Sequence, residues 1–327
     1  MLRKKQSASV IGLEIKPWAI GLVELRPSEA DTDLMNLDIW PVPCPSDRGY
    51  GWDETQRAKA AWELESKLEM VSITSQRLVA SISTRDAWIR TLPVQPEDTD
   101  RILSEKAEQE AVSHLPDFEG NYVVDYELRE DSGEGRKMVV VAARKTCVDR
   151  TRAFLDRLHL RLSVVDVDCF ALERAYRWNY DPDEWTWIAH IRARETELLL
   201  LKNGAFRAVE RIEIPVPHDL PECSSEIEEL ETRGEEFFYV LAKSLLKKAG
   251  TMIEAEASGE VSSTLMLSGP GAQVPPLVDC FRSTHPGPVK RLDPFRRIRI
   301  DPSIAYRAES LRHSVEEYSV PMGLALR

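Results

Sequence analysis

The sequence predicts an α/β protein built from two similar lobes, with a smaller α+β segment inserted into the first lobe. Short strands of alternating apolar residues are followed by a helix in both halves of the 327-residue chain. The opening strands of the two halves align at an offset of 176 residues, which pairs Glu14 with His190 and Lys16 with Arg192. Two copies of strand–strand–strand–helix indicate a pair of ribonuclease-H-like lobes with a cleft between them.

The composition excludes several classes of protein. With 43% apolar and 30% charged residues, and eight each of Trp, Tyr and Phe, the chain can bury a core and is not disordered. The net charge of −12 argues against a general nucleic-acid binder. Five widely spaced cysteines without a CxxC pair predict free thiols, and no histidine spacing is typical of a metal site, so we expect no bound metal.

The sequence predicts neither a membrane span nor a secretory signal. The apolar runs, such as residues 138–143 and 198–201, are far short of the roughly 20 residues that cross a bilayer. The basic residues 3–5 are not followed by the apolar run of a signal peptide. We therefore expect a cytoplasmic protein that is peripheral at a membrane only through its partners.

The first lobe is expected at residues 1–92, where alternating apolar residues favour strands and apolar residues at helical spacing favour one helix. The expected strands are 9–15, 20–25, 34–42, 77–83 and 88–92. The expected helix is 54–71, with Asp53 as its N-cap. A turn at Lys16-Pro17 and a loop over 41–52 connect these elements.

The proline-rich stretch Pro93-Val94-Gln95-Pro96 marks the start of the inserted α+β subdomain, residues 93–163. We expect a helix at 98–114, strands at 122–128 and 137–143 joined by a turn at 131–135, and a helix at 147–158. A strand at 162–167 and a helix at 168–178 then return to the first lobe. Residues 164–182 and the C-terminal segment are expected to complete that lobe.

The second lobe is expected at residues 185–327, after the polar turn 179–184. Its predicted strands are 187–191, 196–201, 205–214, 264–267 and 289–292, and Lys202-Asn203-Gly204 forms a tight turn. A helical insertion near 222–250 contains a helix at 225–248. A short helix at 274–281 and a closing segment at 315–326 complete the lobe.

Several stretches of this chain together resemble the actin-like, FtsA-like family of the type IV pilus assembly protein PilM. They keep the family's order and spacing over nearly the whole chain. The stretches are residues 11–15 (IGLEI), 21–25 (GLVEL), 107–110 (AEQE), 139–145 (VVVAARK), 165–172 (VDVDCFAL), 268–272 (SGPGA), 293–295 (DPF) and 323–326 (GLAL). The resemblance implies an actin-like pair of lobes with an inserted subdomain of the FtsA and PilM type.

The resemblance also implies a nucleotide cleft, in which each lobe supplies a phosphate loop close to Asp-Ile-Gly. Glycine lets the backbone N–H approach a phosphate, and the acid positions Mg²⁺ and water. Here the first loop keeps an acid, Glu14, but has Lys16 in place of glycine and the large ring of Trp18. The second loop has His190 and Arg192 in place of the acid and the glycine. Gly269 and Gly271 resemble the glycine-rich adenosine turn.

These substitutions allow two interpretations of the cleft. In one, Lys16 and Arg192 pair with the phosphate oxygens of a weakly bound nucleotide. In the other, which we prefer because both loops have changed together, the bulky loops fill the cleft. The protein is then a pseudo-ATPase with no catalytic residue and no ATP or Mg²⁺ cofactor.

Three further charged groups are interpreted structurally. Asp166 and Asp168 mark the end of a strand, with Asp168 as a helix N-cap rather than a catalytic carboxylate. The basic residues at 290, 291, 296, 297 and 299 are taken as a solvated face, with an acidic partner or lipid headgroups as the alternative. The acidic run 222–236 is taken as a solvated helix face.

The resemblance implies a cytoplasmic scaffold of a type IV pilus assembly platform. Its expected partners are the cytoplasmic tail of the inner-membrane protein PilN and the assembly ATPase, with no nucleic acid. The family's partner groove lies where the insert meets the first lobe. The alternatives are an active ATPase or sugar-kinase-like enzyme, an FtsA-like division protein, and a component of a type II secretion platform.

Overall fold

The computed structural model describes residues 9–16, 19–27, 31–42, 54–70, 73, 75, 77–131, 135–158, 160–214, 225–256 and 261–327. The chain forms two compact units. The main unit contains residues 1–81 and 154–327, and the small unit contains residues 82–153. The expected Asp53 N-cap, the loop after residue 42, the central part of the 131–135 turn, Cys44, Cys223, Pro17 and Trp18 lie outside the described residues.

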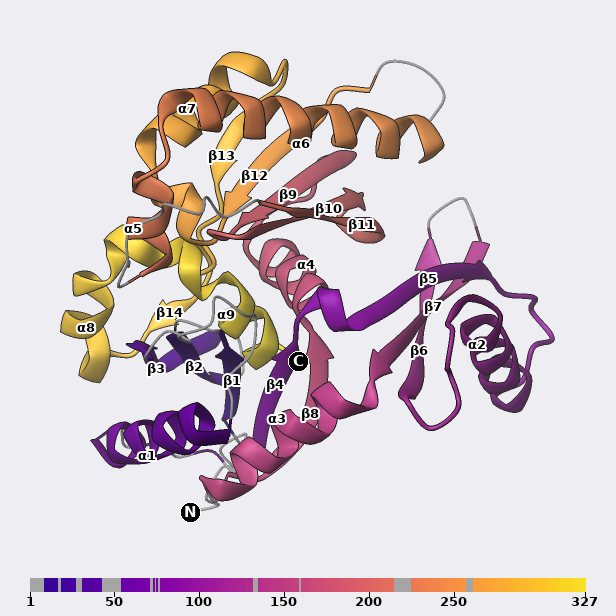
Figure 1. The fold of residues 1–327 in the computed structure, drawn as a ribbon, viewed down its shortest axis with the longest axis horizontal. Coiled ribbons are helices and arrows are strands. Elements are labelled where there is room, and N and C mark those ends of the chain that lie inside the picture. Colours follow the sequence, from indigo (N-terminus) through magenta and orange to yellow (C-terminus); the bar gives the residue numbers. More distant parts are fainter. Residues whose placement is uncertain are drawn as a thin grey trace. The chain divides into compact units, whose positions relative to one another are not determined.

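The main unit contains two sheets of the same topology (Figure 1). In the first sheet, β1 (Val10–Ile15), β2 (Ala19–Pro27) and β3 (Thr32–Pro41) form an antiparallel meander. β4 (Arg77–Ile82) runs parallel to β1, and β8 (Leu162–Val167) lies beside β4. The short β14 (Arg299–Ile300) pairs with the outer edge of β3.

The second sheet repeats this arrangement. β9 (Trp185–Ile191), β10 (Glu195–Lys202) and β11 (Ala205–Glu213) form the meander. β12 (Thr264–Ser268) runs parallel to β9, and β13 (Val289–Arg291) runs parallel to β12. The turn between β10 and β11 has positive φ at Asn203 (50°) and Gly204 (76°), as expected for a type I′ hairpin. The internal repeat predicted from the sequence is therefore present as two equivalent sheets.

Helices cover both faces of each sheet. α1 (Glu54–Met70) and the end of α3 (Lys145–Arg157) bury apolar residues against Ile11 and Leu13 on one face of the first sheet. α9 (Ser319–Ala325) lies on the other face, against Val23 and Leu25. α6 (Glu235–Glu256) and α7 (Pro275–Thr284) cover the second sheet.

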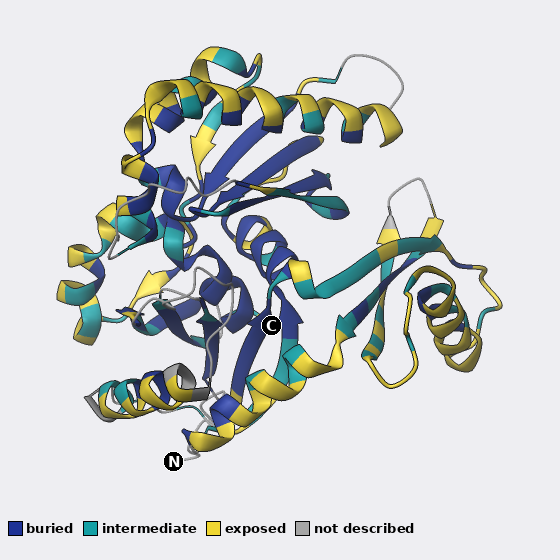
Figure 2. Ribbon diagram, in the orientation of Figure 1, coloured by how far each residue is buried: buried dark blue, intermediate teal, exposed yellow. Residues whose placement is uncertain are grey.

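The two lobes meet through α9 and α4 (Asp168–Asn179). Phe170 of α4 packs edge-to-face on Phe206 of β11, so α4 lies on the second sheet. Gly323 of α9 lies against the backbone of Ala171, where an added Cβ would come within 1.8 Å of the Ala171 carbonyl oxygen. Figure 2 shows α4 and α9 almost wholly buried, whereas α6 and α7 have exposed outer faces. The lobes therefore share a tightly packed helical layer.

The small unit is a three-stranded antiparallel sheet covered by one helix. Its strand order is β5 (Ala87–Pro93), β7 (Gly135–Arg144), β6 (Tyr122–Asp131). α2 (Asp100–His114) places Leu103 and Ala107 on Met138 and Val140, and Thr99 caps its N-terminus.

The boundaries of the small unit differ from those of the expected insert, 93–163. The unit begins at Ile82 because β5 pairs with β7, and it ends at Ala153 because Phe154 and Leu155 join the core of the first lobe. The remaining elements are η1 (Thr84–Asp86), α5 (Glu226–Glu231), η2 (Pro270–Gln273), η3 (Pro302–Ile304), α8 (Ala305–Ser310) and η4 (Arg312–Tyr318). None of the described helices has the length and apolar character that crossing a bilayer requires.

Candidate functional site at the junction of the two lobes

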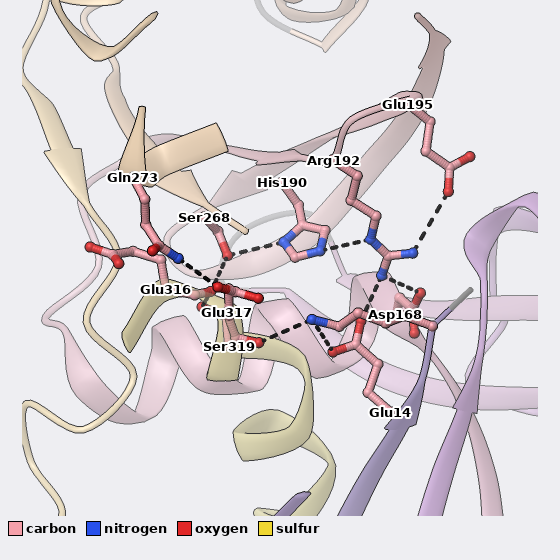
Figure 3. A network of polar contacts seen from close by, with 11 residues as sticks. Glu14, Asp168, His190, Arg192, Glu195, Ser268, Gln273, Glu316, Glu317 and Ser319 are labelled. Carbon is pink, nitrogen blue, oxygen red and sulfur yellow. Dashed lines mark hydrogen bonds and ion pairs between the residues drawn. The ribbon is translucent and has the colours of Figure 1, made fainter. Parts of the chain in front are cut away.

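Charged side chains converge where the carboxyl ends of β1, β9 and β12 approach each other (Figure 3). Glu14 belongs to β1 and Lys16 follows it, whereas His190 belongs to β9 and Arg192 follows it. Asp168 is the first residue of α4. In open α/β sheets, ligands bind beyond the carboxyl ends of the strands, so this is the expected place for a functional site. We call Glu14, Lys16, Asp168, His190, Arg192, Glu195 and Glu226 the junction cluster.

Arg192 is the centre of the junction cluster. Its Nη2 lies 2.7 Å from Glu14 Oε1 and 3.1 Å from Asp168 Oδ2. Its Nη1 lies 3.7 Å from Glu195 Oε1. Burial alone would lower the pKa of Arg192, but the carboxylates of Asp168 and Glu14 outweigh it and hold the pKa well above its ordinary value. The guanidinium therefore stays charged.

His190 is held as a neutral acceptor. Arg192 Nε donates to His190 Nε2 at 3.1 Å, and because Arg has no acceptor, the ring proton must be on Nδ1. Nδ1 then donates to Ser268 Oγ at 3.1 Å, and Ser268 Oγ donates to the Glu316 carbonyl at 3.4 Å. Burial, with the nearby charges of Arg192 and Lys16, keeps the pKa of His190 well below its ordinary value. Both ring nitrogens are thus used in structural hydrogen bonds.

Lys16 is also buried and paired. Its Nζ lies 3.3 Å from Glu14 Oε2 and donates to the Glu317 carbonyl at 3.5 Å. Burial lowers the pKa of Lys16, but the Glu14 carboxylate and Glu317 raise it above its ordinary value. The two cations expected at the phosphate loops therefore pair with carboxylates of the same chain.

Glu226 joins the junction cluster from α5 and was not predicted as a site residue. Burial raises its pKa to about 7. The positive charges of Arg192 and Lys16 oppose this rise, and the negative charges of Glu317 and Glu14 add to it. The interpretation of residues 222–236 as a solvated face is wrong for two of its acidic residues, since Glu229 is also buried and pairs with Arg194 and Arg233. The pattern Ser225-x-x-Glu228 marks the helix start, but it does not indicate which acid is buried.

The assignment of Asp168 as an N-cap is also wrong. The cap position belongs to Val167, which has no side-chain hydrogen bond, and the Asp168 carboxylate instead contacts Arg192. Burial raises the pKa of Asp168 to about 6, although Arg192 opposes the shift. Asp166 binds Arg174 and Arg327 and so fastens the C-terminal segment.

The two glycines of the expected adenosine turn lie against β9. Gly269 has a φ of 77°, and an added Cβ would lie 2.9 Å from the carbonyl oxygen of Ile191. At Gly271 an added Cβ would lie 2.4 Å from Ile191 Cγ2. Both positions need glycine because η2 packs directly on the end of β9.

The basic residues near position 295 are mostly neutralised by local acids. Arg291 pairs with Glu316, Arg297 with Asp181 and Arg299 with Asp33. The guanidinium of Arg296 stacks over the Tyr180 ring, 4.9 Å from its centroid. The described residues contain no group of acids, histidines and cysteines that could hold a metal ion.

Two lobes of one topology, joined at the carboxyl ends of their central strands, define the class: this is the actin-like fold. No family model matches the chain. A chain of a solved "PilM-PilN type IV pilus biogenesis complex" is similar over 99% of both chains, with 23% identity and a TM-score of 0.78.

Two further structures share the fold. One is a Bacteroides thetaiotaomicron protein described as having an actin-like ATPase fold and unknown function, with 11% identity, a TM-score of 0.53, and coverage of 93% and 96% of the two chains. The other is the ethanolamine utilization protein EutJ from Carboxydothermus hydrogenoformans, with 11% identity, a TM-score of 0.51, and coverage of 100% and 92%. These similarities confirm the predicted fold class.

Proposed function

We propose that this protein is a cytoplasmic scaffold of a type IV pilus assembly platform. In this role it docks the cytoplasmic tail of a PilN-like inner-membrane protein, which recruits it to the membrane, and it contacts the assembly ATPase. The observation that carries the proposal is the similarity to a chain of the PilM–PilN complex. That match has a TM-score of 0.78 over 99% of both chains, against 0.53 and 0.51 for the two other actin-like proteins.

The geometry of the junction cluster supports a scaffold over an enzyme. An actin-like ATPase needs phosphate loops whose backbone N–H groups reach a nucleotide. Here Lys16 and Arg192 occupy the corresponding positions with buried side chains, and both are paired with carboxylates. His190, at the position of the second acid, carries no negative charge, and both of its ring nitrogens are already used in hydrogen bonds within the chain. We therefore propose that binding of partners, rather than turnover of nucleotide, is the function.

The proposal is tested with the full chain and a synthetic peptide of the cytoplasmic tail of a PilN-like single-span membrane protein from the same organism. Isothermal titration calorimetry should show saturable binding with a Kd of about 10 μM or tighter, and a scrambled peptide should give no heat. Absence of binding, together with failure of the two full-length proteins to co-purify, would contradict the proposal.

The resemblance implies that the partner groove involves the insert, so the small unit supplies the mapping variants. Val123 is a 47% exposed apolar residue of β6, an edge strand of that unit. Peptides that add to a sheet depend on an open strand edge. We expect Val123→Asp to weaken tail binding at least tenfold, whereas Val240→Asp, at a 56% exposed valine of α6, should leave it unchanged. Equal affinities for the two variants would place the partner elsewhere.

A further inference from the structure

Arg192 links the two lobes directly. It follows β9 in the second lobe, and its guanidinium reaches Glu14 on β1 of the first lobe at 2.7 Å. The side chains are 8% and 1% exposed, so water screens this ion pair very little. On its own side, Arg192 is oriented by His190 at Nε and by Glu195 at Nη1. A planar guanidinium held at two of its nitrogens presents the third in a fixed direction.

A second link between the lobes runs through η4. Lys16 of the first lobe donates to the carbonyl of Glu317. The side chain of Glu317 accepts a 2.9 Å hydrogen bond from Gln273 of η2, which packs on the second sheet. Gly269 N also donates to the Glu316 carbonyl at 3.2 Å. Figure 3 shows the two links side by side, with Arg192 on one and Gln273 and Glu317 on the other.

Removing the central cation would leave these carboxylates in an unfavourable state. Glu14 and Asp168 are buried, and both depend on Arg192 Nη2. Loss of one partner of a buried ion pair is strongly destabilising because the remaining charges are neither hydrated nor neutralised. Asp168 would lose its paired cation and Glu14 would keep only Lys16, so the two carboxylates would regain water only if the lobes moved apart at this point.

We propose that the junction cluster is an ionic clasp, in which Arg192 and Lys16 hold the two lobes in one arrangement without any ligand between them. In this way, side chains of the protein itself connect the two lobes, as a ligand bound between them would otherwise do. The relative position of the lobes is then a constant property of this protein, whether or not its partners are present.

The test is hydrogen exchange of the full chain by mass spectrometry at pH 7.5. In Arg192→Gln, exchange should become at least tenfold faster in peptides covering 10–16 and 185–192, with little change in the outer strands β3 and β11. Arg297→Gln is the matched control, because it removes an exposed Arg–Asp pair outside the junction cluster. If the two variants exchange alike at the junction, the clasp is excluded.

If Arg192→Gln accelerates hydrogen exchange throughout the chain, two further variants still test whether the clasp holds the lobes. The double variant Glu14→Gln/Arg192→Gln removes one orphaned carboxylate and should recover part of the lost protection at residues 10–16. Lys16→Met cuts the second link and removes one of the two cations on Glu14, but it keeps the Arg192–Glu14 pair, so it should accelerate the same peptides less than Arg192→Gln does. If both variants exchange like the wild type at the junction, the proposal is overturned.

Discussion

The junction cluster contains more buried acidic residues than buried basic residues. Glu14, Asp168, Glu195 and Glu226 face Lys16 and Arg192, and all six side chains are at least nine-tenths buried. Lys16 and Arg192 could be found from the sequence because they replace residues that a phosphate loop requires. Glu226 could not be found, because only the packing of α5 distinguishes it from its exposed neighbour Glu228.

The raised pKa of Glu226 predicts how stability depends on pH. Its folded-state pKa, about 7, lies above its ordinary 4.5, so the folded state binds more protons in that window. The contribution of this group to stability is therefore full below pH 4.5 and is lost as the pH rises through 7. Glu226→Gln should be more stable than the wild type at pH 8 by about 3 kcal/mol, with the difference vanishing near pH 4.5.

Urea unfolding of the wild type and of the Glu226→Gln variant from pH 4.5 to 8 measures this difference. His190 acts in the opposite direction, since its lowered pKa costs stability as the pH falls below 6.5, but it is present in both proteins and cancels. Glu228→Gln, on the exposed side of α5, is the control and should follow the wild type. Parallel curves for Glu226→Gln and wild type would show that Glu226 is not buried in its charged form.

At the scale of elements, the strands other than the two-residue β14 were predicted to within a few residues because alternation of apolar side chains is a local signal. The helices were less accurate. The expected helix 225–248 is two helices, α5 and α6, separated by a break at residues 232–234 that contains Gly234. Arg233 folds back onto Glu229 and over the Phe237 ring at this break. These contacts join residues of the two helices, and helical periodicity carries no information about them.

Helix α9 provides an element-scale prediction, because it crosses α4 at a distance that only glycine allows. Gly323→Ala would place a Cβ 1.8 Å from the Ala171 carbonyl oxygen, so the helices must separate. We expect a loss of about 1–3 kcal/mol in the free energy of unfolding, as for other overpacked sites. Gly250→Ala is the matched control. Gly250 lies in α6 with nothing near its Cβ position, and the change should stabilise by about 0.5–1 kcal/mol.

Chemical denaturation of the two glycine variants measures both effects under one set of conditions. The same Gly→Ala substitution is expected to lower the free energy of unfolding at position 323 and to raise it at position 250. If Gly323→Ala unfolds at the denaturant concentration of the wild type, α9 does not pack on α4 as the structure describes.

At the scale of the whole molecule, the repeated topology was predictable because each lobe repeats the same strand pattern. The clasp was not predictable, because Arg192 and Glu14 are 178 residues apart and meet only when both sheets have formed. The Gly-rich turn at 269–271 shows the same limit. Its sequence is compatible with contact to adenosine, but its glycines are also required by the packing of η2 on β9.

The junction cluster also determines how the protein responds to nucleotide. Because Lys16 and Arg192 are buried in ion pairs within the chain, Mg-ATP would have to break the clasp to reach the ends of β1 and β9. A ligand present at 100 times its Kd stabilises the folded state by about 2.7 kcal/mol, which corresponds to a shift of several degrees in Tm. We expect no such shift with millimolar Mg-ATP in differential scanning fluorimetry. A clear shift that Lys16→Ala or Arg192→Ala abolishes, and that Arg297→Ala retains, would instead make the two buried cations phosphate ligands.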